Sequence, residues 1–99
     1  MRVRVTTDAF DDLDSSYEFY EKQEKGVGGY FRDCIEQDLI DLRRTAGIHR
    51  KIKGYHHVNS KIFNSIIYYR MEPDAAVVVS ILDGRIRPSK RDRILKSRR

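Results

Sequence analysis

The sequence has little cysteine and proline, no tryptophan, and no long hydrophobic run. Its single cysteine, Cys34, excludes an internal disulfide and is typical of a protein from a reducing compartment. No apolar stretch approaches the roughly 18 residues that a membrane-spanning helix needs. The first residues, MRVRVTTD, lack the apolar segment of a secretory signal. We therefore expect one cytoplasmic domain spanning residues 1–99, without membrane association.

Acidic and basic residues are segregated along the chain, although the net charge is only +5. Residues 8–43 hold eleven acidic and four basic side chains, a net charge of −7. Residues 44–99 hold fourteen basic and four acidic side chains, a net charge of +10. The last sixteen residues carry eight basic side chains against one acid, Asp92. Such polarity indicates a surface for an anionic partner, and the simpler alternative is a solvated, highly charged end.

Two helices are predicted in the first half of the chain. After a short alternating strand, RVRVT, apolar residues recur at helical spacing from about residue 8 to 25 and again from about residue 30 to 46. The two stripes are Phe10-Leu13-Tyr17-Tyr20 and Phe31-Ile35-Leu39-Leu42. Because only GVGG, residues 26–29, separates them, the helices are expected to form an antiparallel hairpin.

The second half of the chain changes to the pattern of β-strands. SIIYYRM and AVVVSIL are β-branched runs separated by EPDA, which predicts a hairpin of two central strands. IHRKIKGYHHV is also strand-like, and Pro88 can open a short basic helix. The fold class predicted is α+β, with an antiparallel sheet of about four strands and the helical hairpin packed on one face. The order is β-α-α-β-β-β, followed by a short basic C-terminal helix or tail.

Several stretches, taken in order, resemble one protein family. DAFDDLDSSYEFYEKQEKGVGGYF and FNSIIYYRMEPDAAVVVSILDGRIRP resemble the opening and the paired strands of RelE/ParE-type toxins, most closely the plasmid-stabilisation subgroup. The resemblance implies the toxin of a bacterial type II toxin–antitoxin pair, which inhibits growth when free and is neutralised by an acidic antitoxin. Some such toxins inhibit DNA gyrase, and others are ribosome-dependent messenger-RNA endonucleases.

The sequence departs from the ribonuclease branch of that family at most of the positions that carry its chemistry. The branch has a lysine pair near positions 56 and 58, an arginine at 65 and a tyrosine near 91, where this chain has His56, Val58, Ser65 and Arg91. Only Arg85, after the last strand, matches well. The departure favours a gyrase-directed or non-enzymatic mode over messenger-RNA cleavage, so whether the chain is an enzyme is left open.

His56 and His57 are the residues that could replace the missing acid–base groups, because an imidazole titrates near pH 6.5. Adjacent strand residues point to opposite faces, so at most one of them can face a given site, and a purely structural histidine is the alternative. With Arg85 they are the candidate catalytic residues. No metal site and no cofactor is predicted, since His49, His56 and His57 lack ligand spacing.

A larger set of basic side chains is predicted to bind the partner or nucleic acid, because guanidinium and ammonium groups bind phosphate and carboxylate alike. The set comprises Arg50, Lys51, Lys53, Lys61, Arg70, Arg85, Arg87, Lys90, Arg91 and Arg93. The predicted partner is an acidic antitoxin, with DNA gyrase or the ribosome and messenger RNA as alternative targets. A homodimer and a basic nucleic-acid-binding module without toxicity are further open alternatives.

Overall fold

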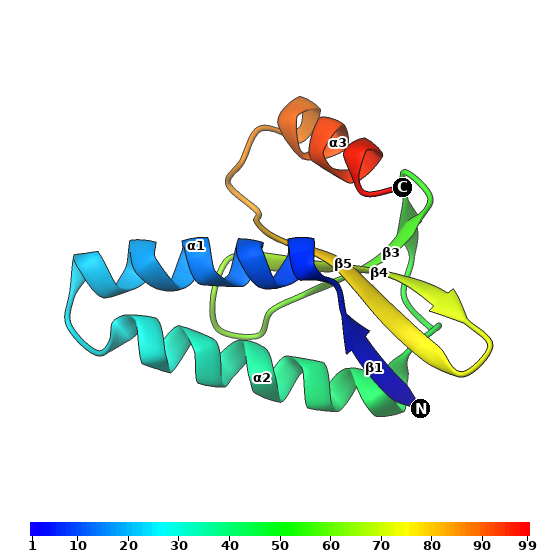
Figure 1. The fold of residues 1–99 in the computed structure, drawn as a ribbon, viewed down its shortest axis with the longest axis horizontal. Coiled ribbons are helices and arrows are strands. Elements are labelled where there is room, and N and C mark those ends of the chain that lie inside the picture. Colours follow the sequence, from blue (N-terminus) through cyan, green and yellow to red (C-terminus); the bar gives the residue numbers. More distant parts are fainter.

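The computed structural model describes all 99 residues and contains five strands and three helices, joined by turns and loops (Figure 1). The strands are β1 (Arg2–Val5), β2 (Lys51–Ile52), β3 (Tyr55–Asn59), β4 (Ser65–Glu72) and β5 (Ala75–Asp83), and the helices are α1 (Thr7–Gln23), α2 (Val27–Thr45) and α3 (Pro88–Ser97). None of the three helices combines the length and the hydrophobicity that a membrane-spanning helix needs. The predicted α+β class and the predicted order of elements are confirmed.

The sheet differs from the prediction in two respects. It has five strands in the order β1-β5-β4-β3-β2, and β1 pairs parallel to β5 whereas the other pairs are antiparallel. The stretch 48–58 supplies two of these strands, β2 and β3, joined by the two-residue turn Lys53-Gly54. Both turn residues have positive φ, 52° and 86°, as a type I′ turn requires. The twist of such a turn matches the right-handed twist of the two strands.

The helical hairpin is held at its turn by a side chain of α1. The Glu21 carboxylate accepts hydrogen bonds from the backbone N–H groups of Gly26 and Gly28, both at 2.9 Å. The connection is shorter than predicted, since residues 27–29 already belong to α2. Gly28 is required for the close approach of the two helices, because a Cβ there would lie 2.7 Å from the carbonyl oxygen of Tyr17.

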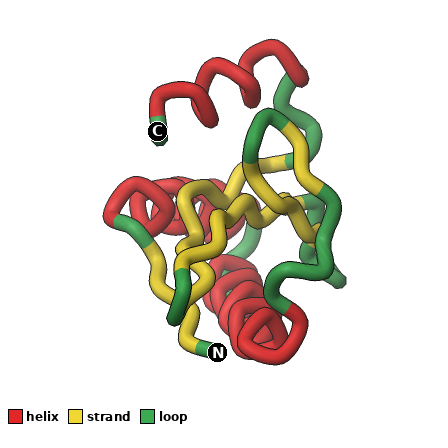
Figure 2. The backbone as a smooth tube through the Cα atoms, turned by 90° about the vertical axis from the view of Figure 1, so that its right-hand side faces the viewer, coloured by secondary structure: helices red, strands yellow, loops and turns green.

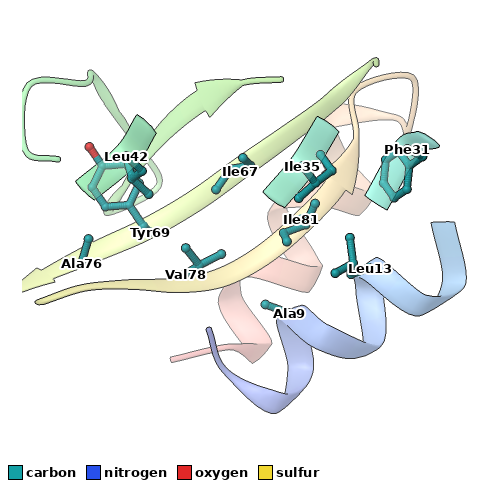
Figure 3. Close-up of a cluster of buried hydrophobic side chains, with 10 residues drawn as sticks. All are labelled: Ala9, Leu13, Phe31, Ile35, Leu42, Ile67, Tyr69, Ala76, Val78 and Ile81. Atoms are coloured by element: carbon teal, nitrogen blue, oxygen red, sulfur yellow. The ribbon is translucent and has the colours of Figure 1, made fainter. Parts of the chain in front are cut away.

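The hairpin covers one face of the sheet, as predicted. Figure 3 shows the side chains of α1 and α2 directed at those of β4 and β5. The buried cluster consists of Ala9, Leu13, Phe31, Ile35, Leu42, Ile67, Tyr69, Ala76, Val78 and Ile81. The prediction that Phe10 belongs to the buried stripe of α1 is wrong. Phe10 is 51% exposed, and its neighbour Ala9 is fully buried instead. The small Ala9 lets α1 approach β5 closely, and Phe10 is rotated to the outer surface.

The other face of the sheet is covered by α3, so the basic C-terminal segment is a docked helix and not a free tail. Figure 2 shows α3 on the opposite side of the strands from α2. Leu95, 1% exposed, packs against a second apolar cluster that includes Tyr55, Tyr68, Val77 and Val79. Ile86 and Ile94 pack beside it, partly buried. The molecule therefore has three layers, with the sheet in the middle.

Two charged residues from opposite ends of the chain close the edge of β5. Beyond the four residues paired with β1, this edge has no partner strand. The Asp12 carboxylate accepts a hydrogen bond from the backbone N–H of Ile81 at 3.0 Å, and Arg98 donates to the carbonyl of Val79 at 2.9 Å. Arg98 also binds Asp12 through two nitrogens, at 2.9 and 3.0 Å. The pair thus satisfies backbone groups that a neighbouring strand would otherwise satisfy.

Candidate functional site

A polar pocket of about 380 Å³ lies at the end of the sheet where β4 begins and β5 ends. It is bounded by the 60–64 loop, by the first residues of β4 and by the turn after β5. Its lining residues are Asn59, Ser60, Phe63, Asn64, Ser65, Ile66, Gly84 and Arg85. Apart from Arg85, none of these residues was predicted as a site residue. The signal that could have found them is the cluster of Asn and Ser around a turn between two strands.

Backbone hydrogen bonds hold the pocket walls together. The N–H of Ser60 donates to the carbonyl of Ser65 at 2.8 Å, and the N–H of Gly84 donates to the carbonyl of Asn64 at 2.6 Å. A Cβ on Gly84 would lie 3.3 Å from that same carbonyl oxygen, so the glycine permits the close approach. The turn that carries Arg85 is thereby fixed against the loop before β4.

Arg85 is occupied by a carboxylate of its own turn. Its Nε lies 3.0 Å from one oxygen of Asp83, and its Nη2 lies 2.7 Å from the other. The hydrogen bond to Arg85 lowers the pKa of Asp83, and the same contact raises the pKa of Arg85. The side chains are 58% and 29% exposed for Arg85 and Asp83 respectively, so the pair is open to solvent and to competing anions.

The two candidate histidines lie away from Arg85. His57 pairs with Tyr68, whereas the end of the sheet near Arg85 is marked by the pair Ser65 and Asp83. Three residues of strand separate the two positions, about 10 Å at 3.3 Å per residue. The structure therefore does not bring Arg85 together with His56 or His57 in one constellation.

His56 and His57 face opposite sides of the sheet, as strand alternation predicts. The ring of His56 stacks on Tyr69 with centroids 5.0 Å apart, and its Nδ1 lies 2.6 Å from the carbonyl of His49. These contacts make His56 part of the packing against the helical hairpin. His57 lies beside Tyr68 on the α3 side, and its Nδ1 is buried without a hydrogen-bond partner.

His49 completes a polar network around Tyr69. The N–H of Gly47 donates to the Tyr69 hydroxyl at 2.9 Å, and His49 Nδ1 lies 2.5 Å from the same oxygen. Burial lowers the pKa of His49, and the nearby His56 and His57 lower it further. Because Gly47 already donates to the Tyr69 oxygen, the geometry fits a Tyr69 hydroxyl that donates a hydrogen bond to His49 Nδ1. Tyr69 and Tyr68 are 0% and 3% exposed, so neither ring offers a free face for stacking a base.

Several of the predicted basic residues are already paired within the protein. Lys61 binds Asp41, Arg70 binds Glu72 at 3.2 Å, and Lys53 lies 3.7 Å from Asp92. The side chain of Arg91 donates to the carbonyls of Gly84 and Ile86 and so fixes the start of α3. The exposed members of the set that have no ion pair are Arg50, Lys51, Arg87, Lys90 and Arg93.

The sheet divides the predicted basic set between its two sides. Arg70 pairs with Val77, whose side chain packs in the α3 cluster, so Arg70 lies on the α3 side. Lys51 pairs with His56, which faces the helical hairpin. Lys53, Arg93, Lys96 and Arg99 line one surface beside α3. Lys51 and Lys61 lie on the other side, and Lys61 binds Asp41 of α2 there.

Comparison with known proteins identifies the fold. No protein-family model matches the chain, and no curated protein matches it. Among solved structures, it superimposes with a TM-score of 0.72 on a chain of the chromosomal ParDE TA system from P. aeruginosa. The superposition covers 82% of this chain and 92% of that chain, at 17% sequence identity. The predicted likeness to RelE/ParE-type proteins is therefore confirmed at the level of the fold.

Proposed function

We propose that this chain is the toxin of a toxin–antitoxin pair, of the plasmid-stabilisation type, that inhibits growth in the cytoplasm when free. The observation that carries the proposal is the shared fold with a chain of the ParDE system, at a TM-score of 0.72. The order of the short motifs along the sequence supports it independently. The partner is an acidic antitoxin, which the exposed basic side chains of α3 would attract.

A gyrase-directed or non-enzymatic mode of action is favoured over messenger-RNA cleavage. Ser65, which stands where the ribonuclease branch has an arginine, is 3% exposed and supplies no positive charge. Arg85 is engaged by Asp83, and His57 and His56 lie about 10 and 13 Å along the sheet from that end of the strands. A ribosome-dependent endoribonuclease of RelE type and a nontoxic nucleic-acid-binding module are the alternatives.

Toxicity is tested by inducing the chain alone in bacteria and following growth. Growth should stop, and the arrest should weaken when Arg85 and Arg87 are changed to Ala, because both side chains are exposed on the basic turn. Arg4→Gln is the matched control, because Arg4 is also an exposed arginine in an ion pair, with Glu72, but lies on β1 and not on the basic turn. Soluble, folded protein without any effect on growth would contradict the proposal.

The target is identified by two assays run side by side. Messenger-RNA cleavage in a translating extract indicates the endonuclease alternative, and gyrase-dependent DNA breaks indicate the favoured mode.

Antitoxin capture is tested with the acidic protein encoded by a neighbouring reading frame. Reversing the charges of Arg93 and Lys96 should slow its association at low salt, because the two exposed side chains belong to α3. Equal association rates at low and high salt would show that α3 does not steer the partner.

A further inference from the structure

The pocket at Arg85 contains one charge among neutral hydrogen-bonding groups. Two hydroxyls come from Ser60 and Ser65, two amides come from Asn59 and Asn64, and the guanidinium comes from Arg85. The side chains of Phe63 and Ile66 add apolar surface. Hydroxyls and amides both donate and accept hydrogen bonds, so the wall can bind peptide N–H and C=O groups. A volume of about 380 Å³ lies within the range of ligand clefts.

One group of the pocket lacks a hydrogen-bond partner. The Ser60 hydroxyl is buried and makes no hydrogen bond, and the residue as a whole is 9% exposed. Buried hydroxyls in folded proteins are nearly always paired, so an unpaired one in a pocket wall is a site for a hydrogen bond from an ordered water or from a ligand. The observation is independent of the charge on Arg85.

Arg85 is already arranged to hold a carboxylate. The two oxygens of Asp83 meet its Nε and Nη2 side by side, which is the geometry in which guanidinium binds planar carboxylates. Because the pair is exposed, its two members are held weakly and can be exchanged. An incoming carboxylate would take over these hydrogen bonds, and the released Asp83 carboxylate, already 29% exposed, would be hydrated by solvent.

We propose that this pocket anchors an acidic side chain of the partner protein. Its carboxylate takes the place of Asp83 on Arg85, and the adjoining peptide backbone binds the Ser60 hydroxyl and the Asn59 and Asn64 amides. The proposal rests on the function proposed above, in which the partner is an acidic protein. It makes Asp83 an internal competitor that keeps the anchor occupied in the free protein.

A protein partner fits the pocket better than nucleic acid does. Phosphate backbones are bound by rows of basic side chains, and only one basic side chain lines this pocket. Of the basic residues in the adjoining segments, Lys61 binds Asp41 and Arg91 donates to backbone carbonyls, so Arg87 is the one that is exposed and has no ion pair.

The test is a titration of the full chain, followed by NMR at the Arg85 Nε–H and the Asn59 and Asn64 side-chain amides. The probe is acetyl-glutamate N-methylamide, with the glutamine analogue and inorganic phosphate as comparisons. We expect saturable shifts with the glutamate probe and none with the glutamine probe. Asp83→Asn should tighten binding about two- to fivefold, the effect of removing one exposed ion-pair competitor.

Variants separate the anchor from general charge effects. Arg85→Gln should abolish the shifts, Ser60→Ala should weaken binding about threefold through the lost hydrogen bond, and Arg4→Gln should leave binding unchanged. Absence of saturation with the glutamate probe, or equal binding of the glutamine probe, overturns the proposal. Tighter binding of phosphate than of glutamate would instead assign the pocket to a phosphate ligand and also overturn it.

The outcome can be told apart from failure of the proposed function. If the chain arrests growth and its acidic neighbour rescues it, but Arg85→Gln binds that neighbour as tightly as the wild type, only the anchor is wrong. If the glutamate probe binds as expected but the chain has no effect on growth, the pocket stands as a carboxylate site and the toxin function is wrong.

Discussion

Arg98→Met should lower the free energy of unfolding by about 2–3 kcal/mol, a large effect for the penultimate residue of a chain. Methionine keeps the length and apolar stem of the side chain but removes its five donors. In the structure, Arg98 holds Asp12 through two nitrogens and also donates to the carbonyl of Val79 and the hydroxyl of Ser80. The substitution therefore removes one partner from each of these groups at once.

The magnitude follows from burial at this edge of the sheet. The Arg98 and Asp12 side chains are only 15% and 14% exposed, so the pair is mostly shielded from water. Breaking a buried ion pair by removing one partner costs about 3–5 kcal/mol, and each unsatisfied buried polar group costs about 1–3 kcal/mol. Because Arg98 lies just beyond the end of α3, the last turn can open and admit water, which brings the expected cost down to about 2–3 kcal/mol, at or just below the lower limit for a broken buried pair.

Urea unfolding of the wild type, Arg98→Met, Asp12→Asn and the double variant measures the effect and the coupling. The two single changes should be strongly non-additive, with a coupling of about 1–2 kcal/mol, because each removes the same pair. Amide exchange at Ile81 should quicken in both, since Asp12 accepts that N–H. A cost below about 0.5 kcal/mol, typical of a solvated surface pair, would refute the reasoning, as would strict additivity.

Three further predictions concern the layers on either side of the sheet. Gly28→Ala should destabilise the protein by more than 1 kcal/mol in urea unfolding, because the added methyl would lie 2.7 Å from a backbone oxygen of α1. Gly29→Ala, where nothing lies within 4 Å, should be neutral or stabilising by up to about 1 kcal/mol, and equal costs at both sites would refute the argument. Leu95→Ala should cost about 2–4 kcal/mol, because it empties a site that is 1% exposed, and a loss below about 1 kcal/mol would show that α3 is not docked. The pKa of His49 in the folded protein lies below its ordinary value of 6.5. Its contribution to stability is therefore complete above pH 6.5 and is lost as the pH falls from there through the folded pKa. The stability lost between pH 7 and 5 should be smaller in His49→Asn than in the wild type, and an equal loss in both would show that the histidine is solvated.

The helical hairpin and the paired strands could be read from the sequence because their signals are local. Apolar residues three or four apart define a helix face, and the β-branched runs around EPDA define β4 and β5. The same locality explains the error at Phe10. Periodicity places a stripe to within about one residue, and the tight contact between α1 and β5 then selected Ala9 for the interior.

The sequence by itself determined the class of fold, the order of elements and the concentration of positive charge in the last sixteen residues. Only the tertiary structure decided where those charges are used. In the folded protein Leu95 packs α3 against the sheet, and Arg91 donates hydrogen bonds to backbone carbonyls. Arg85 lies apart from the two histidines. Long-range pairing depends on the sum of many weak contacts between distant segments, which leaves no local pattern in the chain.

The same reason applies to the groups with the most specific geometry. Asp12 and Arg98 are separated by 86 residues, and no periodicity connects them. The parallel pairing of β1 with β5 and the pocket between the 59–66 segment and Arg85 likewise join segments far apart in the sequence. Side chains of ordinary type line a polar pocket around Arg85 and cap the edge of the sheet only because the packed helices and the twisted sheet bring them together.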